Sequence, residues 1–67
     1  MFKRKDLDFE VQDEGSIVLL RPLTVAATHW VMDNIGEEAQ WFGRAVVVEP
    51  RYLGNILEGI AEAGFAY

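Results

Sequence analysis

Apolar and polar residues alternate along the first part of the chain. Leu7, Phe9 and Val11 are each followed by a polar residue, a period of two that is typical of a β-strand with one face in water. An apolar run over residues 17–20 follows and ends at Arg21-Pro22. The pattern therefore predicts two strands joined by a short loop.

The loop residues predict how these strands pair. Gly15 stands where a three-residue hairpin loop requires a positive φ, so we expect Gln12 to lie opposite Ser16. In that register Val11 faces Ile17 and Phe9 faces Leu19 on one side of the sheet. The residues on the other side are then Asp8, Glu10, Val18 and Leu20.

Capping residues predict two helices further along the chain. The first runs from Thr24, as its N-cap, to Ile35, and Gly36 supplies a left-handed stop. Its apolar stripe consists of Leu23, Ala27, Trp30, Val31 and Ile35.

The second helix begins at Pro50 and stops at Gly64, after which Phe65 is expected to fold back as in a Schellman motif. Its apolar stripe consists of Leu53, Ile56, Leu57 and Ile60. We interpret Gly54 and Gly59 inside this helix as places where another backbone packs closely.

Between the helices, residues 44–49 are apolar on both faces and predict an interior strand. Gly43 directly before it is typical of a bulge or a close backbone approach. The pleat of the strand would turn Trp41 and Phe42 to opposite faces of the sheet.

The element order is strand, strand, helix, strand, helix, with a short additional strand at 65–67. Because a sheet must cover its apolar face, this order predicts an α+β fold, a two-layer sandwich with both helices on one face of a small sheet. We expect a single domain over residues 1–67, with a basic N-terminal tail at 1–6.

The uncovered face of that sheet would carry Val18 and Leu20, with either Val46 and Val48 or Ala45 and Val47, depending on the bulge. This is more apolar surface than a wet face needs, and such a patch usually marks an interface. A chain of 67 residues without cysteine has no disulfide to stabilise its small core, so association is the remaining remedy. We therefore expect a homo-oligomer, most simply a dimer.

The charge balance restricts the class of partner. Six basic and eleven acidic side chains give a net charge of −5, and Lys3, Arg4 and Lys5 all lie in the tail. From Asp6 onward three arginines stand against the same eleven acids, a balance of −8. This disfavours direct binding to nucleic acid, and it fits a protein partner with a basic surface or simple solubility.

No pattern of catalytic or cofactor-binding residues occurs in the sequence. Ser16 and His29 belong to no nucleophile motif. His29 and Asp33 are four residues apart, a spacing typical of an ordinary side-chain pair on the surface of a helix. A single histidine and no cysteine leave no zinc site. We therefore expect that the protein is not an enzyme and binds neither a cofactor nor a metal. No apolar run is long enough to cross a membrane, and no signal peptide is evident, so we expect a cytoplasmic protein.

Several short segments together resemble a known group of sequences. They are Gly15-Ser16-Ile17, Ala26-Ala27, Trp30-Val31, Glu38-Ala39-Gln40-Trp41-Phe42-Gly43 and Val47-Val48-Glu49-Pro50-Arg51-Tyr52. The chain is similar, over about residues 9–65, to short uncharacterised bacterial proteins that are often met in prophage or plasmid settings and have no assigned activity. The resemblance transfers no functional residue, but a mobile-element setting favours an accessory protein that modulates a host factor.

Three functional hypotheses follow. The first is a non-enzymatic, dimeric interaction module that binds a host protein through Trp41, Phe42, Arg44, Val18 and Leu20, because aromatic residues beside arginine are typical of interface hot spots. The second is a charge mimic of nucleic acid that inhibits a nuclease or regulator through Asp8, Glu10, Asp13, Glu14, Glu37 and Glu38. The third is a small enzyme whose pocket is built by a dimer around His29, Asp33 or the turn carboxylates.

Overall fold

The computed structural model describes residues 7–36 and 39–67, which form a four-stranded antiparallel sheet and two helices. The elements are β1 (Phe9–Asp13), β2 (Val18–Pro22), α1 (Val25–Asn34), β3 (Gln40–Phe42), β4 (Ala45–Val48) and α2 (Pro50–Glu62). The strands lie in the order β1-β2-β4-β3, so β1 and β3 are the two edges. The α+β fold is as predicted, with β3 as a further strand. The predicted basic tail at 1–6 lies outside the described residues.

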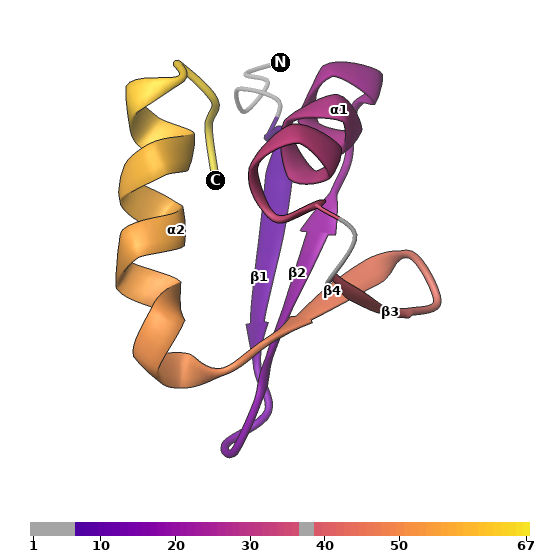
Figure 1. Cartoon of the computed structure of the whole chain (residues 1–67), viewed down its shortest axis with the longest axis vertical. Helices are drawn as coiled ribbons and strands as arrows, with labels where there is room; N and C mark the ends of the chain where they lie inside the picture. The colour runs from indigo at the N-terminus through magenta and orange to yellow at the C-terminus, as the bar shows by residue number, and fades with distance from the viewer. Residues whose placement is uncertain (1–6, 37–38) are drawn as a thin grey trace, which may run out of the picture.

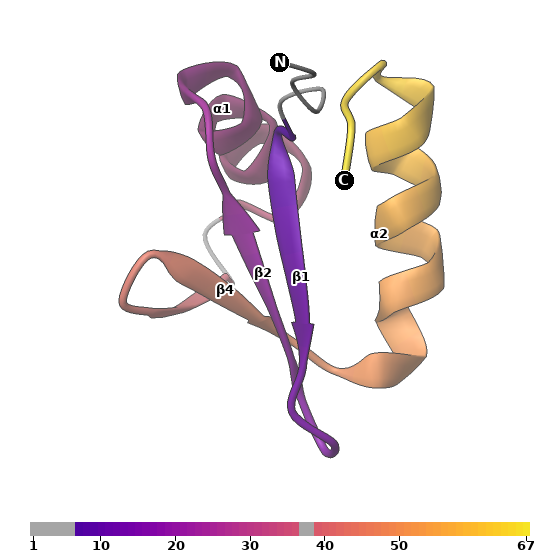
Figure 2. The ribbon, with the colours of Figure 1, turned by 180° about the vertical axis from the view of Figure 1, so that it is seen from behind.

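The two views of the ribbon show how the layers are arranged. In Figure 1, α1 lies in front of β1 and β2, and α2 runs beside the sheet. Figure 2 shows β1 and β2 from behind, with the β3–β4 hairpin projecting to the side opposite α2. Within the described residues, neither helix has the length and apolar character needed to cross a bilayer.

The register of β1 and β2 differs from the predicted one. Val11 lies opposite Leu20 and Asp13 opposite Val18, so the predicted pairing of Gln12 with Ser16 is wrong. The loop has four residues, 14–17, and is closed by the Glu14 N–H, which donates to the Ile17 carbonyl at 2.9 Å. Gly15 has the predicted positive φ, of 92°, but a positive φ fits this longer loop equally well.

This register decides which strand residues enter the core. Val18 and Leu20 share a face with Phe9, and that face is covered by both helices. The prediction that Val18 and Leu20 lie on the uncovered face is therefore wrong, since their side chains are 2% and 0% exposed. The buried cluster consists of Phe9, Val18, Leu20, Ala27, Val31, Val46, Val48 and Ile60.

An aromatic cluster holds the helices to the edge strand β1. The fully buried ring of Phe9 meets Trp30 of α1 edge to face at 6.0 Å, and Phe65, beyond α2, at 5.7 Å. The Ala66 carbonyl accepts hydrogen bonds from the N–H groups of Asp8 and Phe9, at 2.9 and 3.1 Å. Residues 65–67 form no strand of the sheet, contrary to the prediction, yet they cover the start of the β1 edge.

The predicted helix ends are confirmed. The Thr24 hydroxyl accepts a hydrogen bond from the Ala27 N–H at 3.0 Å and so caps α1. Pro50 is the first residue of α2. At its end the Phe65 N–H donates to the Ile60 carbonyl and the Gly64 N–H to the Ala61 carbonyl, which together make the Schellman motif.

The apolar stripes are confirmed with one exception. Ala27 and Val31 are buried, and Trp30, Ile35, Leu53, Ile56 and Leu57 pack against the core as half-buried residues. Leu23 departs from its predicted stripe because it precedes the first turn of α1 and is exposed.

The two glycines inside α2 have different surroundings. A Cβ added at Gly59 would lie 3.1 Å from Cζ2 of the Trp30 indole, whereas one added at Gly54 would meet nothing within 4 Å. The interpretation of Gly54 as a close approach is therefore wrong, and the neighbour of Gly59 is a side chain rather than a backbone.

This difference predicts that replacing glycine with alanine affects stability differently at the two positions. Gly54→Ala should raise the free energy of unfolding by about 0.5–1 kcal/mol, because alanine has the higher helix propensity. Gly59→Ala should give no such gain, because the added methyl group presses on the packed Trp30 ring. Urea denaturation followed by circular dichroism measures both values, and equal gains in the two variants would show that Trp30 is not held in place.

Candidate functional site: the β3–β4 hairpin and the open sheet face

The segment Trp41-Phe42-Gly43-Arg44 is a hairpin rather than a bulged strand. Phe42 lies opposite Ala45, so Gly43 and Arg44 form a two-residue turn between β3 and β4. Gly43 has a φ of 63°, and no residue other than glycine has a positive φ among those described. This combination is the type II′ turn, which favours glycine at its first central position. The predicted bulge at Gly43 is therefore wrong.

The pleat turns the two aromatic residues of this hairpin to opposite faces, as predicted. Trp41 lies opposite Val46 and thus on the face that the helices cover. Phe42 lies opposite Ala45 on the open face, and its side chain is 69% exposed. The hairpin therefore presents one aromatic residue to each side of the sheet.

The open face combines apolar residues with arginine. The register places Leu19, Ala45 and Val47 on it, and Leu19 and Val47 are half-buried. A hollow of about 200 Å³ lies beside Phe42. Its lining consists of Glu10, Gln12, Leu19, Arg21, Phe42, Arg44 and Ala45. This volume is below the usual range for a small-molecule pocket, so the face is suited to contact with another macromolecule.

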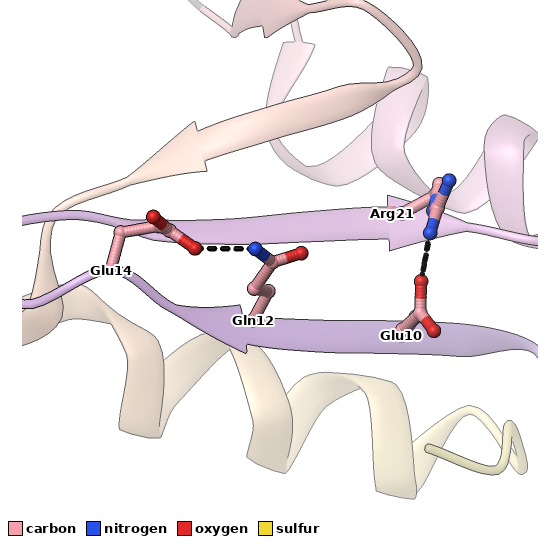
Figure 3. A network of polar contacts seen from close by, with 4 residues as sticks. All are labelled: Glu10, Gln12, Glu14 and Arg21. Atoms are coloured by element: carbon pink, nitrogen blue, oxygen red, sulfur yellow. Dashed lines mark hydrogen bonds and ion pairs between the residues drawn. The ribbon is translucent and has the colours of Figure 1, made fainter.

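The two arginines beside the open face differ in their partners, and Figure 3 shows the paired one, Arg21. Arg21 forms an ion pair with Glu10 across the strands, with Nε donating to the carboxylate at 3.0 Å, and Gln12 donates to Glu14. The other ion pair in the described part of the chain joins Arg51 to Glu49. Arg44 at the hairpin tip is exposed and has no acidic partner among these residues.

A larger groove lies on the other side of the hairpin, against α1. Its volume is about 500 Å³. Its lining consists of Pro22, Leu23, Thr24, Val25, Thr28, Met32, Trp41, Gly43 and Arg44. Four of the nine exposed large apolar side chains in the described residues line it, namely Leu23, Val25, Met32 and Trp41. The sequence analysis missed this groove, although Val25 and Met32 are seven residues apart and so share one helix face.

The structure separates the predicted partner-binding residues into three groups. Phe42 and Arg44 line the open face, and Trp41 lies in the α1 groove with Arg44 at its border. Val18 and Leu20 are core residues and are removed from the site, because the observed register turns them under the helices.

Several residues of the predicted acidic surface have a hydrogen-bond or ion-pair partner within the chain. Asp8 is a structural acceptor, since its carboxylate takes hydrogen bonds from the Ala66 N–H at 2.9 Å and the Thr24 hydroxyl at 3.4 Å. Glu10 is paired with Arg21, and Asp13 accepts from the Gly15 N–H at 2.8 Å within its own turn. Glu14 is exposed, and Glu37 and Glu38 lie outside the described residues. The described acids do not form one face of free carboxylates, so charge mimicry stays a prediction without structural support.

The candidate catalytic groups are not brought together. His29 and Asp33 are exposed on α1, and no hydrogen bond or ion pair joins them. The loop that contains Ser16 lies at the opposite end of the molecule from α1 (Figure 1). Within residues 7–36 and 39–67, no group of three histidine, cysteine or acidic residues could hold a metal ion.

Comparison with known proteins gives no match: no family model, no curated protein and no solved structure resembles this chain significantly.

Two acids on β1 should respond differently to truncation. Asp8→Ala should lower the free energy of unfolding by about 1–2 kcal/mol, because it leaves the Ala66 N–H without its charged acceptor. Glu10→Ala should cost less than about 1 kcal/mol, because the ion pair with Arg21 is half exposed to water. Urea denaturation of both variants tests this, with Asp8→Asn as an intermediate control. Equal losses at the two positions would contradict the structural role of Asp8.

Proposed function

We propose that this protein is a non-enzymatic interaction module that binds another protein through the open face of its sheet, with Phe42 as the anchor. The observation that carries the proposal is the 69% exposure of this phenylalanine on a face that neither α1 nor α2 covers, next to Leu19 and Ala45. Arg44 lies beside it and has no acidic partner among the described residues. An exposed aromatic ring beside arginine, around a shallow apolar centre, has the composition of an interface hot spot.

The chemistry of the surface describes the partner. The partner offers an apolar pocket for the Phe42 ring. Beside that pocket it has a carboxylate or a backbone carbonyl that accepts a hydrogen bond from Arg44. The net charge of −5 favours a partner with a basic surface around this contact, because long-range attraction raises the rate of encounter. The prophage or plasmid setting suggested by the resemblance in sequence makes a host protein the natural candidate.

Substitution of the anchor should weaken binding strongly and leave the fold intact. Phe42→Ala should weaken the partner's affinity by about 30-fold or more, the usual effect of truncating a hot-spot residue. Its stability should change little, because most of the ring is already in water. Tyr52→Ala is the matched control, since Tyr52 is an aromatic residue with 49% exposure on α2.

A photo-crosslinking amino acid at position 42, compared with position 52, tests the contact directly. In the cells that carry the gene, position 42 should form an adduct with a protein other than this chain, and position 52 should not. Mass spectrometry then identifies the partner. Titration of the purified partner with wild type, Phe42→Ala and Tyr52→Ala measures the three affinities. No adduct at position 42, or equal affinity of Phe42→Ala and wild type, would refute the proposal.

A further inference from the structure

The two edge strands of the sheet differ in how far they are protected from pairing with another strand. At the β1 edge, Asp8 and Phe9 donate to the Ala66 carbonyl, and β1 carries the charged residues Glu10 and Asp13. The β3 edge consists of Gln40, Trp41 and Phe42, all exposed and uncharged. No segment among the described residues pairs with its outer side. Edges of this kind are usually protected by charge, proline or a covering segment, so the β3 edge is open to pairing with another strand.

The hairpin turn fixes which backbone groups face outward from β3. Phe42 and Ala45 close the two-residue turn, so their N–H and C=O groups point towards each other. Because the direction alternates along a strand, the N–H and C=O of Trp41 point away from β4. Gln40 points back towards Val47. The edge therefore offers one donor and one acceptor, both from Trp41.

The side chains next to this edge are apolar. Trp41 is 41% exposed and lines the α1 groove with the exposed residues Leu23, Val25 and Met32. The lining of the groove comes from the β3–β4 hairpin and from α1 and the residues just before it. Figure 2 shows that this hairpin projects to the side opposite α2. Free backbone groups and an exposed apolar groove therefore coincide at one end of the sheet.

We propose that a second copy of this chain occupies the β3 edge and the α1 groove, with its own β3 antiparallel to the first about a two-fold axis at Trp41. The Trp41 N–H of each copy donates to the Trp41 carbonyl of the other, and the two four-stranded sheets become one continuous sheet. The two indoles lie opposite each other on the helix-covered face, where the grooves of both copies enclose them.

A second copy fits this edge better than an unrelated strand does. A two-fold axis at one residue satisfies all the outward groups of both chains, and a self-complementary interface needs the same residues from each partner. The strand carries no charge, so the acidic copies meet where neither has a carboxylate on the edge. Each copy also covers Val25, Met32 and Trp41 of the other, which adds apolar burial to a chain with a small core.

The dimer is a separate claim from the binding of a partner at Phe42, since it uses the other face of the hairpin. It also places the Phe42 rings of both copies on one continuous open face. Phe42→Ala should therefore remain dimeric, which allows each proposal to fail without the other.

Light scattering after size-exclusion chromatography, with full-length protein loaded at about 100 μM, tests the oligomeric state. The wild type should have twice the 7.6 kDa mass of one chain, and Trp41→Lys should have the mass of one chain. Tyr52→Lys, a matched lysine on α2, should stay dimeric. A monomeric wild type, or a dimeric Trp41→Lys, would overturn the proposal.

Amide hydrogen exchange measured by NMR on the wild type does not depend on any variant folding. The Trp41 amide should exchange slowly in concentrated solution and at least tenfold faster on dilution to the monomer. The Phe42 amide, which belongs to the β3–β4 ladder, should stay protected at both concentrations. A Trp41 exchange rate that is independent of concentration would overturn the pairing even if a dimer forms by another surface.

Discussion

The packing of Phe9 between the sheet and the two helices is the interaction on which the rest of the structure depends. Its ring is fully buried and meets Trp30 and Phe65 edge to face, so one side chain of β1 contacts residues from both helical regions. Such aromatic pairs add about 0.5–1.5 kcal/mol beyond the burial of their area. Gly59 lets α2 approach the Trp30 ring, and Ala66 then reaches the β1 backbone. The covered edge of the sheet is thus a consequence of this cluster, and β3 is the edge that no segment of the described residues covers.

Local signals were sufficient to predict the helices but not the register of β1 and β2. Thr24, Gly36, Pro50 and Gly64 act through their own backbone neighbourhood, so their roles can be read from a few residues. The run Ile17-Val18-Leu19-Leu20 is apolar at every position, so its pattern is compatible with either face being buried. A positive φ at Gly15 also suits both loops. The choice is made by tertiary packing, which places Leu20 beside Val11 and next to Phe9 on the covered face.

The position of Gly43 explains why the site was only half predicted. A glycine between two aromatic residues and a valine run is consistent with either a bulge or a type II′ turn, and a strand as short as Gln40–Phe42 gives no alternation by which to recognise it. The pleat correctly separated Trp41 from Phe42, but it did not indicate which of the two is the more exposed. The predicted interior strand included Arg44, whereas this residue lies in the turn. The pairing of Trp41 with the exposed face of α1 depends on the strand order, which the sequence does not contain in any local form.

The distribution of charge along this acidic chain is compatible with the proposed dimer. Among the described residues, the acids lie on β1 and its turn, at the end of α1, and along α2, whereas residues 39–48 carry Arg44 as their single charge. The β3–β4 hairpin also projects away from α2 (Figure 1), so the acids of α2 lie on the other side of the molecule from the β3 edge. Repulsion between charges separated by more than about 8 Å is largely screened at physiological ionic strength. In the proposed dimer, the uncharged β3 edge can therefore join two copies while the acidic surfaces of both remain in water.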